Sequence, residues 1–366
     1  MSANLEIANL RKVFNTGKPA VDDVSFTVEA GEIVVLLGPS GCGKATTLRC
    51  VAGLEHPTGG TIRIGDAIVS DPARGLLVPP RARNVGMVFQ SYAVWPHMTV
   101  RQNVAYPLKN RGLTGAEAAR KVDGALDLVD LAHYADRPVV QLSGGQMQRV
   151  ALARSMVYQP RLLLLDEPLS NLDAQLRLRL RDDLRRIIKA AGLTALYVTH
   201  DQLEAVVLGD RIGVMQHGKL LQMAPPEEVY NRPADLFVAS FTGASNFLPG
   251  TLRERQGEFG TIELAGGHTM QAWCAASLAP GTPVTLAIRP ENIRLEAASA
   301  QNRFDAEVVS QRFQGVQTAY ALRLAGTTIE ALATGTTMRH PAGTTVTINI
   351  PPEVCWAYAA QSAPAP

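Results

Sequence analysis

A glycine-rich stretch, residues 38–44, has the residue types and spacing needed to hold a chain of phosphates. Its sequence is GPSGCGK; it follows an apolar run at 33–37 that is typical of a strand and precedes a helical pattern. Glycines let the backbone approach phosphate oxygens closely, so that successive N–H groups and the start of the helix point at the anion. Lys44 adds a mobile positive charge for the outer phosphates. The pattern predicts a phosphate-binding loop, whereas the same glycines without Lys44 would indicate only a turn.

The residue after Lys44 departs from the usual pattern of such loops. This position normally carries Ser or Thr, whose hydroxyl ligates Mg²⁺, and here it is Ala45. Thr46 does not replace that hydroxyl, because one step along a helix turns the side chain by about 100°. A water could fill the place, and losing one neutral ligand to a charged centre would cost about 1.5–3 kcal/mol. We therefore expect ATP to bind and hydrolysis to be slowed.

A second motif, LSGGQ at 142–146, opens another helix. Ser143 is placed to cap that helix, and the glycines after it leave N–H groups open to an anion. About 20 residues later comes the apolar run LLLL at 162–165, which ends in Asp166 and Glu167. A phosphate-binding loop alone would fit kinases, GTPases and many ATPases. The LSGGQ motif between that loop and the acidic pair narrows the choice among these classes of protein.

The elements that must position these residues alternate between strands and helices. Strand patterns at 24–37, 162–165 and 195–199 alternate with helical patterns at 44–54, 116–129, 146–157 and 176–191. Such alternation predicts a mainly parallel sheet with helices on its faces. After about residue 240, short Val-, Thr- and Ile-rich segments separated by Gly and Pro predict an all-β domain. We expect domains at 1–240 and 241–358, with a helical subdomain at about 91–160 in the first and a disordered tail at 359–366.

The composition excludes several classes of protein. Lys and Arg total 35 against 33 Asp and Glu, a net charge of +2, which does not favour nucleic acid as a partner. The four cysteines lack the spacing of a zinc site and are typical of reduced intracellular thiols. The N-terminal residues have no apolar signal-peptide core, and no apolar run approaches the roughly 20 residues that span a bilayer. Any link to a membrane is therefore expected to come through a partner protein.

With all these motifs in order, residues 4–240 resemble the ATP-binding subunits of bacterial ABC importers. The chain is most similar to the group that carries a C-terminal TOBE/OB-type regulatory domain, which includes sugar, polyamine and ferric-iron importers. The sequence AIRPENI at 287–293 resembles the motif of that domain. The resemblance implies an α/β P-loop NTPase fold, with an ABC ATPase core and helical subdomain, followed by an all-β OB-like domain.

The family's site roles carry over to matching positions of this chain. Asp166 resembles the carboxylate that holds Mg²⁺, and Glu167 matches the general base that polarises the attacking water. Gln90 matches the glutamine that reaches both metal and water, and His200 the histidine that contacts the γ-phosphate. Taken alone, each has an ordinary alternative: a solvated turn for the acidic pair, a surface glutamine, and a structural histidine at the end of a strand.

The resemblance also implies how ATP is held. Phe14 fits the aromatic residue that stacks on adenine, although a core position would explain it equally well. The residues expected to bind the nucleotide within one chain are Phe14, Gly38, Pro39, Ser40, Gly41, Cys42, Gly43, Lys44, Ala45 and Thr46. Those expected to reach a nucleotide bound by the neighbouring chain are Ser143, Gly144, Gly145, Gln146 and Asp173.

The resemblance further implies partners, cofactors and a location. ATP and Mg²⁺ are the expected cofactors, and a second copy of the chain, membrane permease subunits and, indirectly, an extracytoplasmic substrate-binding protein are the expected partners. The chain would lie on the cytoplasmic face of the membrane, with the aromatic segment at 92–97 near the permease. The amino-acid sequence of that segment favours ferric iron or a polyamine as cargo. Two alternatives stay open: a subunit that binds ATP but turns over weakly because of Ala45, and a soluble ABC ATPase outside transport.

Overall fold

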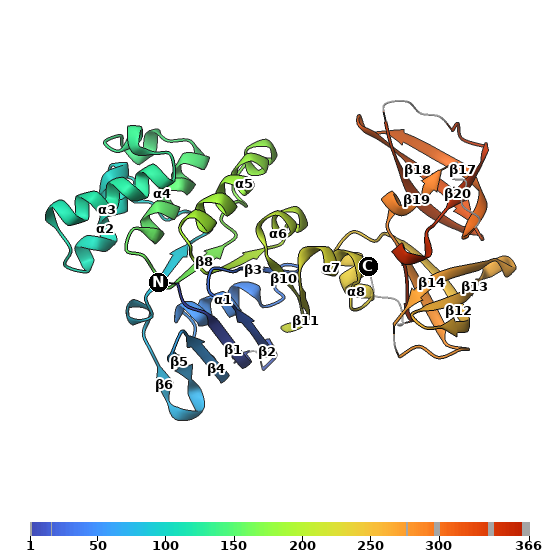
Figure 1. The fold of residues 1–366 in the computed structure, drawn as a ribbon, viewed down its shortest axis with the longest axis horizontal. Coiled ribbons are helices and arrows are strands. Elements are labelled where there is room, and N and C mark those ends of the chain that lie inside the picture. Colours follow the sequence, from blue (N-terminus) through green and yellow to red (C-terminus); the bar gives the residue numbers. More distant parts are fainter. Residues whose placement is uncertain (1, 16, 276, 296–300, 336–339, 361–366) are drawn as a thin grey trace. The chain divides into compact units, whose positions relative to one another are not determined.

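The chain folds into two compact units, Met1–Val229 and Tyr230–Pro366. The computed structural model describes residues 2–15, 17–275, 277–295, 301–335 and 340–360 (Figure 1). The division falls before the predicted boundary at 240/241, because the segment that follows Tyr230 packs within the second unit. It shares a small buried core with later strands, formed by Ala239, Ala244, Ala287, Trp356 and Tyr358.

A six-stranded sheet in the order β11-β10-β3-β9-β8-β7 forms the centre of the first unit. Its strands are β3 (Ile33–Leu37), β7 (Val85–Val88), β8 (Leu162–Asp166), β9 (Ala195–Thr199), β10 (Arg211–Gln216) and β11 (Lys219–Ala224). β3, β8 and β9 are buried along their whole length, as parallel strands covered on both faces must be. Leu37 pairs with Thr199, and Asp166 pairs with Val198, all in parallel register. The residues that follow these three strands therefore meet at one edge of the sheet.

A second, antiparallel sheet of the first unit has the order β2-β1-β4-β5-β6. Its strands are β1 (Leu5–Val13), β2 (Pro19–Val28), β4 (Gly59–Ile64), β5 (Ala67–Asp71) and β6 (Leu76–Leu77). Helix α1 (Lys44–Ala52) contributes Leu48 and Val51 to a core shared with both sheets. This packing fixes the start of α1, and with it the end of the glycine-rich loop.

The remaining helices of the first unit form two groups. They are α2 (Val100–Asn110), α3 (Gly115–Leu128) and α4 (Gly144–Met156), then α5 (Ala174–Ala190) and α6 (Gln202–Leu208). Helix α7 (Pro226–Asn231) spans the division between the two units. Figure 1 shows α2, α3 and α4 gathered on the side of the unit away from β1, β2, β4 and β5. Short 3-10 turns join the elements: η1 (Pro72–Arg74), η2 (Pro80–Ala82), η3 (Ala132–Tyr134) and η4 (Val139–Gln141). Within the described residues, no helix is long and apolar enough to cross a bilayer.

The second unit is built almost entirely of β-strands. A closed barrel contains β12 (Asn246–Gln256), β13 (Phe259–Leu264), β14 (Thr269–Cys274), β15 (Pro283–Ile288) and β21 (Cys355–Ala359). A five-stranded sheet contains β16 (Arg294–Leu295), β17 (Arg303–Phe313), β18 (Gln317–Leu324), β19 (Thr327–Thr334) and β20 (Thr345–Asn349). Helix α8 (Leu236–Phe241) and the turns η5 (Ala265–Gly267), η6 (Pro290–Asn292) and η7 (Pro352–Val354) complete it.

The end of the chain differs from the predicted tail at 359–366. Ala359 is the last residue of β21, and the Ala360 N–H donates to the Pro283 carbonyl at 2.9 Å. Order therefore extends through Ala360, because β21 pairs with both β14 and β15 to close the barrel. Residues 361–366 lie outside the described residues.

Arg289, from the AIRPENI stretch, holds the segment that enters the second unit. Its side chain is fully buried and donates to the carbonyl oxygens of Thr242 and Tyr230. The guanidinium also lies 3.6 Å from the ring centroid of Tyr230 and 5.4 Å from that of Trp356. The charge is therefore compensated by carbonyl dipoles and aromatic faces.

Candidate nucleotide-binding site

The glycine-rich loop joins β3 to α1, as the sequence predicts. The Lys44 side chain is only 4% exposed, and its Nζ donates to the carbonyl oxygens of Gly38 (2.6 Å) and Pro39 (2.9 Å). The ammonium is thus held inside its own loop, at the first residue of α1. A phosphate oxygen that replaced these carbonyls would meet the lysine charge and the helix N-terminus together.

Two glycines of the loop cannot be replaced without a rearrangement. A Cβ on Gly38 would lie 2.3 Å from the Met215 carbonyl oxygen, and one on Gly43 would lie 2.4 Å from that of Ala20. Gly43 also has φ of 109°, a backbone conformation that other residues rarely adopt. Close packing against neighbouring strands therefore explains why glycine stands at both positions.

Asp166, at the end of β8, is a buried carboxylate beside α1. It is 7% exposed, and Arg49 of α1 approaches it with 3.6 Å between Nη2 and Oδ2. Burial is the main reason that the pKa of Asp166 is raised, while the positive charge of Arg49 opposes the shift. Sequence reasoning missed Arg49, although its place one turn after Ala45 on the same helix could have indicated it.

Glu167 and His200 come together at the edge formed by β8 and β9. Nδ1 of His200 lies 3.0 Å from Oε2 of Glu167, so the two predicted catalytic residues are neighbours. Glu167 has φ of 44°, a left-handed conformation that is uncommon for a residue other than glycine. The turn after Glu167 is closed by Ser170, whose N–H and Oγ both donate to the Glu167 carbonyl. Strain of this kind is typical of residues held in place for a function.

The turn that carries His200 rests on a buried glutamate that sequence reasoning did not single out. Glu204 is 2% exposed and accepts hydrogen bonds from the hydroxyls of Tyr197 (2.9 Å) and Thr199 (2.7 Å). Burial is the largest effect on Glu204 and raises its pKa. Asp201 caps α6 by accepting the Glu204 N–H at 3.0 Å. Because these contacts lie on both sides of His200, they hold the backbone from which its ring projects.

Gln90 follows β7, and its side chain is exposed. The backbone of this loop is tied to the segment after Glu167, because Nδ2 of Asn171 donates to the Gln90 carbonyl at 2.8 Å. Asp173 caps α5 by accepting the Leu176 N–H at 2.9 Å. Gln90, Glu167 and Asp173 are thus joined through one short segment, residues 167–173.

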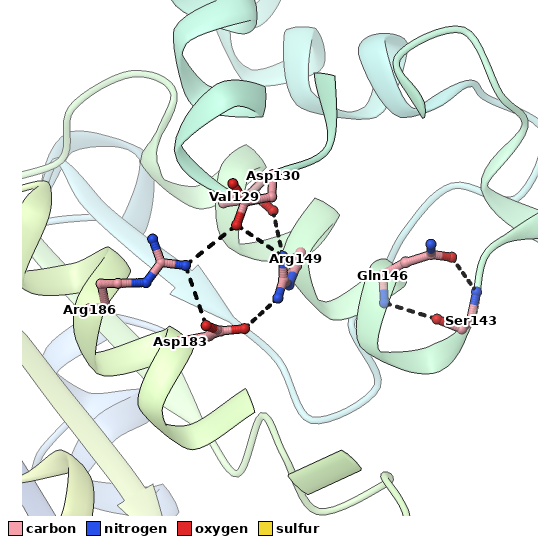
Figure 2. Close-up of polar contacts among 7 residues, drawn as sticks. All are labelled: Val129, Asp130, Ser143, Gln146, Arg149, Asp183 and Arg186. Atoms are coloured by element: carbon pink, nitrogen blue, oxygen red, sulfur yellow. Dashed lines mark hydrogen bonds and ion pairs between the residues drawn. The ribbon is translucent and has the colours of Figure 1, made fainter. Parts of the chain in front are cut away.

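Ser143 caps α4 in a reciprocal arrangement with Gln146, which Figure 2 shows. The Gln146 N–H donates to Oγ of Ser143 at 3.4 Å, and the Ser143 N–H donates to Oε1 of Gln146 at 2.9 Å. Since Oγ acts as an acceptor here, the exposed Ser143 hydroxyl keeps its own hydrogen to donate to an anion. Ser143, Gly145 and Gln146 also line a pocket of about 240 Å³ beside Leu176 and Leu180.

A network of four charged side chains anchors α4 to α5. Arg149 of α4 pairs with Asp183 of α5 and, at 3.4 Å, with Asp130 (Figure 2). Arg186 of α5 pairs with the same two carboxylates, at 3.4 Å to Asp130 and 3.3 Å to Asp183. Since Arg149 belongs to the helix that Ser143 caps, the network sets the position of that helix against α5.

Phe14 lies just after β1 and is 41% exposed. Nζ of Lys12 lies 4.6 Å from its ring centroid, and Lys12 also pairs with Glu55 at 3.2 Å. Such exposure does not fit the alternative that Phe14 is a core residue. A partly exposed aromatic ring can stack on a base.

The donors near Asp166 fit a hard metal ion that arrives with a nucleotide. Asp166 and Gln90 offer only carboxylate and amide oxygens, which Mg²⁺ prefers, and Ala45 offers no ligand atom. Among the described residues, no group of three or more His, Cys, Asp or Glu side chains could hold a metal alone. The chemistry of the site therefore fits an ion that depends on phosphate oxygens and water for most of its ligands.

Comparisons with known proteins agree with this geometry. The ABC transporter family matches residues 21–170, and the TOBE domain matches residues 286–357. The chain also resembles the structure of cbiO1 from Clostridium perfringens, part of the ABC transporter complex cbiONQ. The TM-score is 0.57 at 27% identity, and the match covers 64% of this chain and 93% of that one.

Several curated relatives match more of the chain. The trehalose/maltose import ATP-binding protein of Thermococcus litoralis is 50% identical over 69% of this chain and 68% of its own length. The spermidine/putrescine import ATP-binding protein of Pseudomonas fluorescens is 41% identical over 96% of this chain and 97% of its own. An Fe(3+) ions import ATP-binding protein of Rhizobium meliloti is 44% identical over 85% of each. The chain therefore belongs to the ATP-hydrolysing, ATP-binding subunits of ABC importers.

Proposed function

We propose that two copies of this chain close face to face and hold each ATP between the Lys44 loop of one copy and the Ser143 helix of the other. The observation that carries the proposal is the exposed, capped start of α4, which keeps a hydroxyl hydrogen and backbone N–H groups for an anion. Neither surface encloses a nucleotide alone, so ATP would join the two copies. Hydrolysis would remove the γ-phosphate that bridges them, and the copies would part.

Within the shared site, this chain's residues would act by positioning and by charge. Lys44 would exchange the carbonyls of Gly38 and Pro39 for phosphate oxygens. Glu167 would accept a proton from the attacking water, and His200, 3.0 Å from that carboxylate, would keep it oriented and contact the γ-phosphate. Asp166 and Gln90 would hold Mg²⁺, which, when bound, neutralises charge on the phosphates.

The membrane partners follow from the import function of the family. We propose that permease subunits bind the segment after Gln90, including Trp95, and that they hold the chain at the cytoplasmic face of the membrane. An extracytoplasmic binding protein would act through the permease, and the second unit would brace the two copies. The relatives' names give four different cargoes: trehalose/maltose, sn-glycerol-3-phosphate, spermidine/putrescine and Fe(3+). Since one kind of subunit serves all of them, we propose that the permease and its binding protein select the cargo, and ferric iron or a polyamine stays a prediction for this chain.

Of the two alternatives from the sequence, the import relatives exclude a soluble ATPase outside transport. Weak turnover remains a second candidate, because no hydroxyl stands at position 45.

The proposal is tested by trapping the closed dimer. Glu167→Gln should bind ATP but hydrolyse it at least about a hundredfold more slowly, and sedimentation should show a larger fraction of dimer with ATP than without nucleotide. Glu117→Gln, at an exposed position on α3, serves as the matched control. A Glu167→Gln protein that stays monomeric with saturating ATP, or a wild-type rate per molecule that is independent of protein concentration, would contradict the shared site.

A further inference from the structure

The loop after Gln90 contains two consecutive residues in an unusual conformation. Tyr92 has φ of 60° and Ala93 has φ of 49°, although neither is glycine. Each left-handed residue of this kind costs free energy and persists only where its surroundings hold it. The turn's own backbone contributes hydrogen bonds from the Tyr92 N–H to Phe89 and from the Ala93 N–H to Ser91.

A single arginine on α4 holds both strained residues. Arg154 donates from Nη1 to the Ala93 carbonyl at 2.6 Å and from Nη2 to the Tyr92 carbonyl at 2.8 Å. Its guanidinium also lies 4.6 Å from the ring centroid of Trp95. The side chain is only 7% exposed, and its burial lowers the pKa of the guanidinium. The buried guanidinium of Arg154 therefore binds the loop rather than water.

Two further side chains, one on α4 and one just after it, bind the strand that leads to Gln90. Oγ of Ser155 donates to the Met87 carbonyl at 2.8 Å, and Oη of Tyr158, just beyond the helix, donates to the Val85 carbonyl at 2.8 Å. Together with Arg154, these contacts attach α4 to the backbone from Val85 to Ala93, on both sides of Gln90. The same helix begins at Ser143, the residue proposed to touch the neighbour's ATP.

The Trp95 end of the loop is equally well defined. The ring centroids of Trp95 and Tyr106 of α2 lie 4.2 Å apart. The backbone N–H of Trp95 donates to Oδ1 of Asn103 at 2.9 Å. Asn103 is fully buried. Trp95 is therefore packed between the arginine of α4 and two residues of α2.

We infer that Arg154 is a positioning residue that couples the helix beginning at Ser143 to the Gln90 loop of the same chain. When α4 moves as the dimer closes on ATP, Arg154 imposes that movement on the carbonyls of Tyr92 and Ala93 and on the Trp95 ring. Lysine cannot replace it, because one ammonium cannot offer two parallel N–H donors and a planar face to Trp95 together. The inference rests on the proposed dimer for its trigger, but its contacts lie within one chain.

The test compares Arg154→Lys with Arg120→Lys, an exposed arginine on α3, in the full chain. We expect Arg154→Lys to bind ATP with a Kd within about twofold of wild type, because Lys44 is unaffected. Its kcat and the ATP-dependent change in Trp95 fluorescence should each fall about tenfold, while Arg120→Lys keeps both. The fluorescence that Trp95→Phe loses is that of Trp95, which distinguishes it from the fluorescence of Trp273 and Trp356.

The outcomes separate this inference from the proposed function. If wild type shows neither an ATP-dependent dimer nor hydrolysis, the proposed function fails. If wild type shows both and Arg154→Lys matches Arg120→Lys in kcat and in Trp95 signal, the inference is overturned.

A double-mutant comparison covers the case in which Arg154→Lys loses stability. Trp95→Leu removes the ring and leaves Arg154 in place, and the Arg154→Lys/Trp95→Leu protein should be no slower than the slower single variant. Rate losses that simply multiply would show independent roles and would also overturn the inference.

Discussion

Restoring a hydroxyl at position 45 should speed hydrolysis by this chain. Ala45 is the second residue of α1, directly after Lys44, and is only half-buried, so one added oxygen need not displace core side chains. Asp166, the carboxylate that we propose binds Mg²⁺, also pairs with Arg49 at 3.6 Å, so a further oxygen ligand from position 45 would add more to metal binding. A hydrogen bond or ligand contact to a charged group contributes about 1.5–3 kcal/mol. If all of it stabilised the transition state, Ala45→Ser would raise kcat by about 10- to 150-fold.

The assay is phosphate release at saturating ATP over a range of Mg²⁺ concentrations, together with the affinity for ATP with and without Mg²⁺. Ala45→Cys is the matched control, because its thiol has nearly the same shape but is a poor ligand for a hard cation. We expect Ala45→Ser to bind Mg²⁺·ATP more tightly, to bind metal-free ATP unchanged, and to hydrolyse faster than both wild type and Ala45→Cys. Equal rates for the serine and cysteine variants would refute the argument that a missing oxygen ligand limits this site.

Two further predictions concern the supports of the site. Burial raises the pKa of Glu204, which means that the folded protein favours the protonated side chain. The stability that Glu204 contributes is therefore fully present below the ordinary glutamate pKa and is lost as the pH rises through the raised pKa. The glutamine of Glu204→Gln does not titrate, so the melting temperature of this variant should rise relative to that of wild type as the pH increases. A difference in melting temperature that stays constant across pH would contradict this prediction. Asp183→Asn weakens the partly exposed pair with Arg149 and should cost about 0.5–1 kcal/mol in unfolding free energy, measured by urea denaturation. Asp182→Asn, at the exposed neighbouring position, should cost nothing measurable, and an equal loss in both variants would argue against the network.

The sequence predicts the chemistry of the site better than the means by which it is held. Local patterns are enough for the Lys44 loop, the Ser143 cap and the strand before Glu167, because each depends on residues close together in the chain. The contact between Glu167 and His200 needed only parallel strands of similar length. Arg49, Arg154 and Glu204 were missed, since their partners lie on other elements or are backbone atoms that carry no sequence signal. The division before Tyr230 carries no local sequence signal for the same reason: the burial of Arg289 against Tyr230 depends on residues 59 positions apart.

A cross-link between two differently tagged copies tests the shared site most directly. One copy carries Ser40→Cys in the Lys44 loop, the other carries Ser143→Cys, and both carry Glu167→Gln to slow hydrolysis. Ser40 and Ser143 are exposed, whereas the native cysteines Cys42, Cys50, Cys274 and Cys355 are buried and should react little. We predict a disulfide between the two tagged chains that forms with ATP and not without nucleotide. A yield that ATP does not change would contradict the claim that each copy supplies half of the nucleotide's binding site.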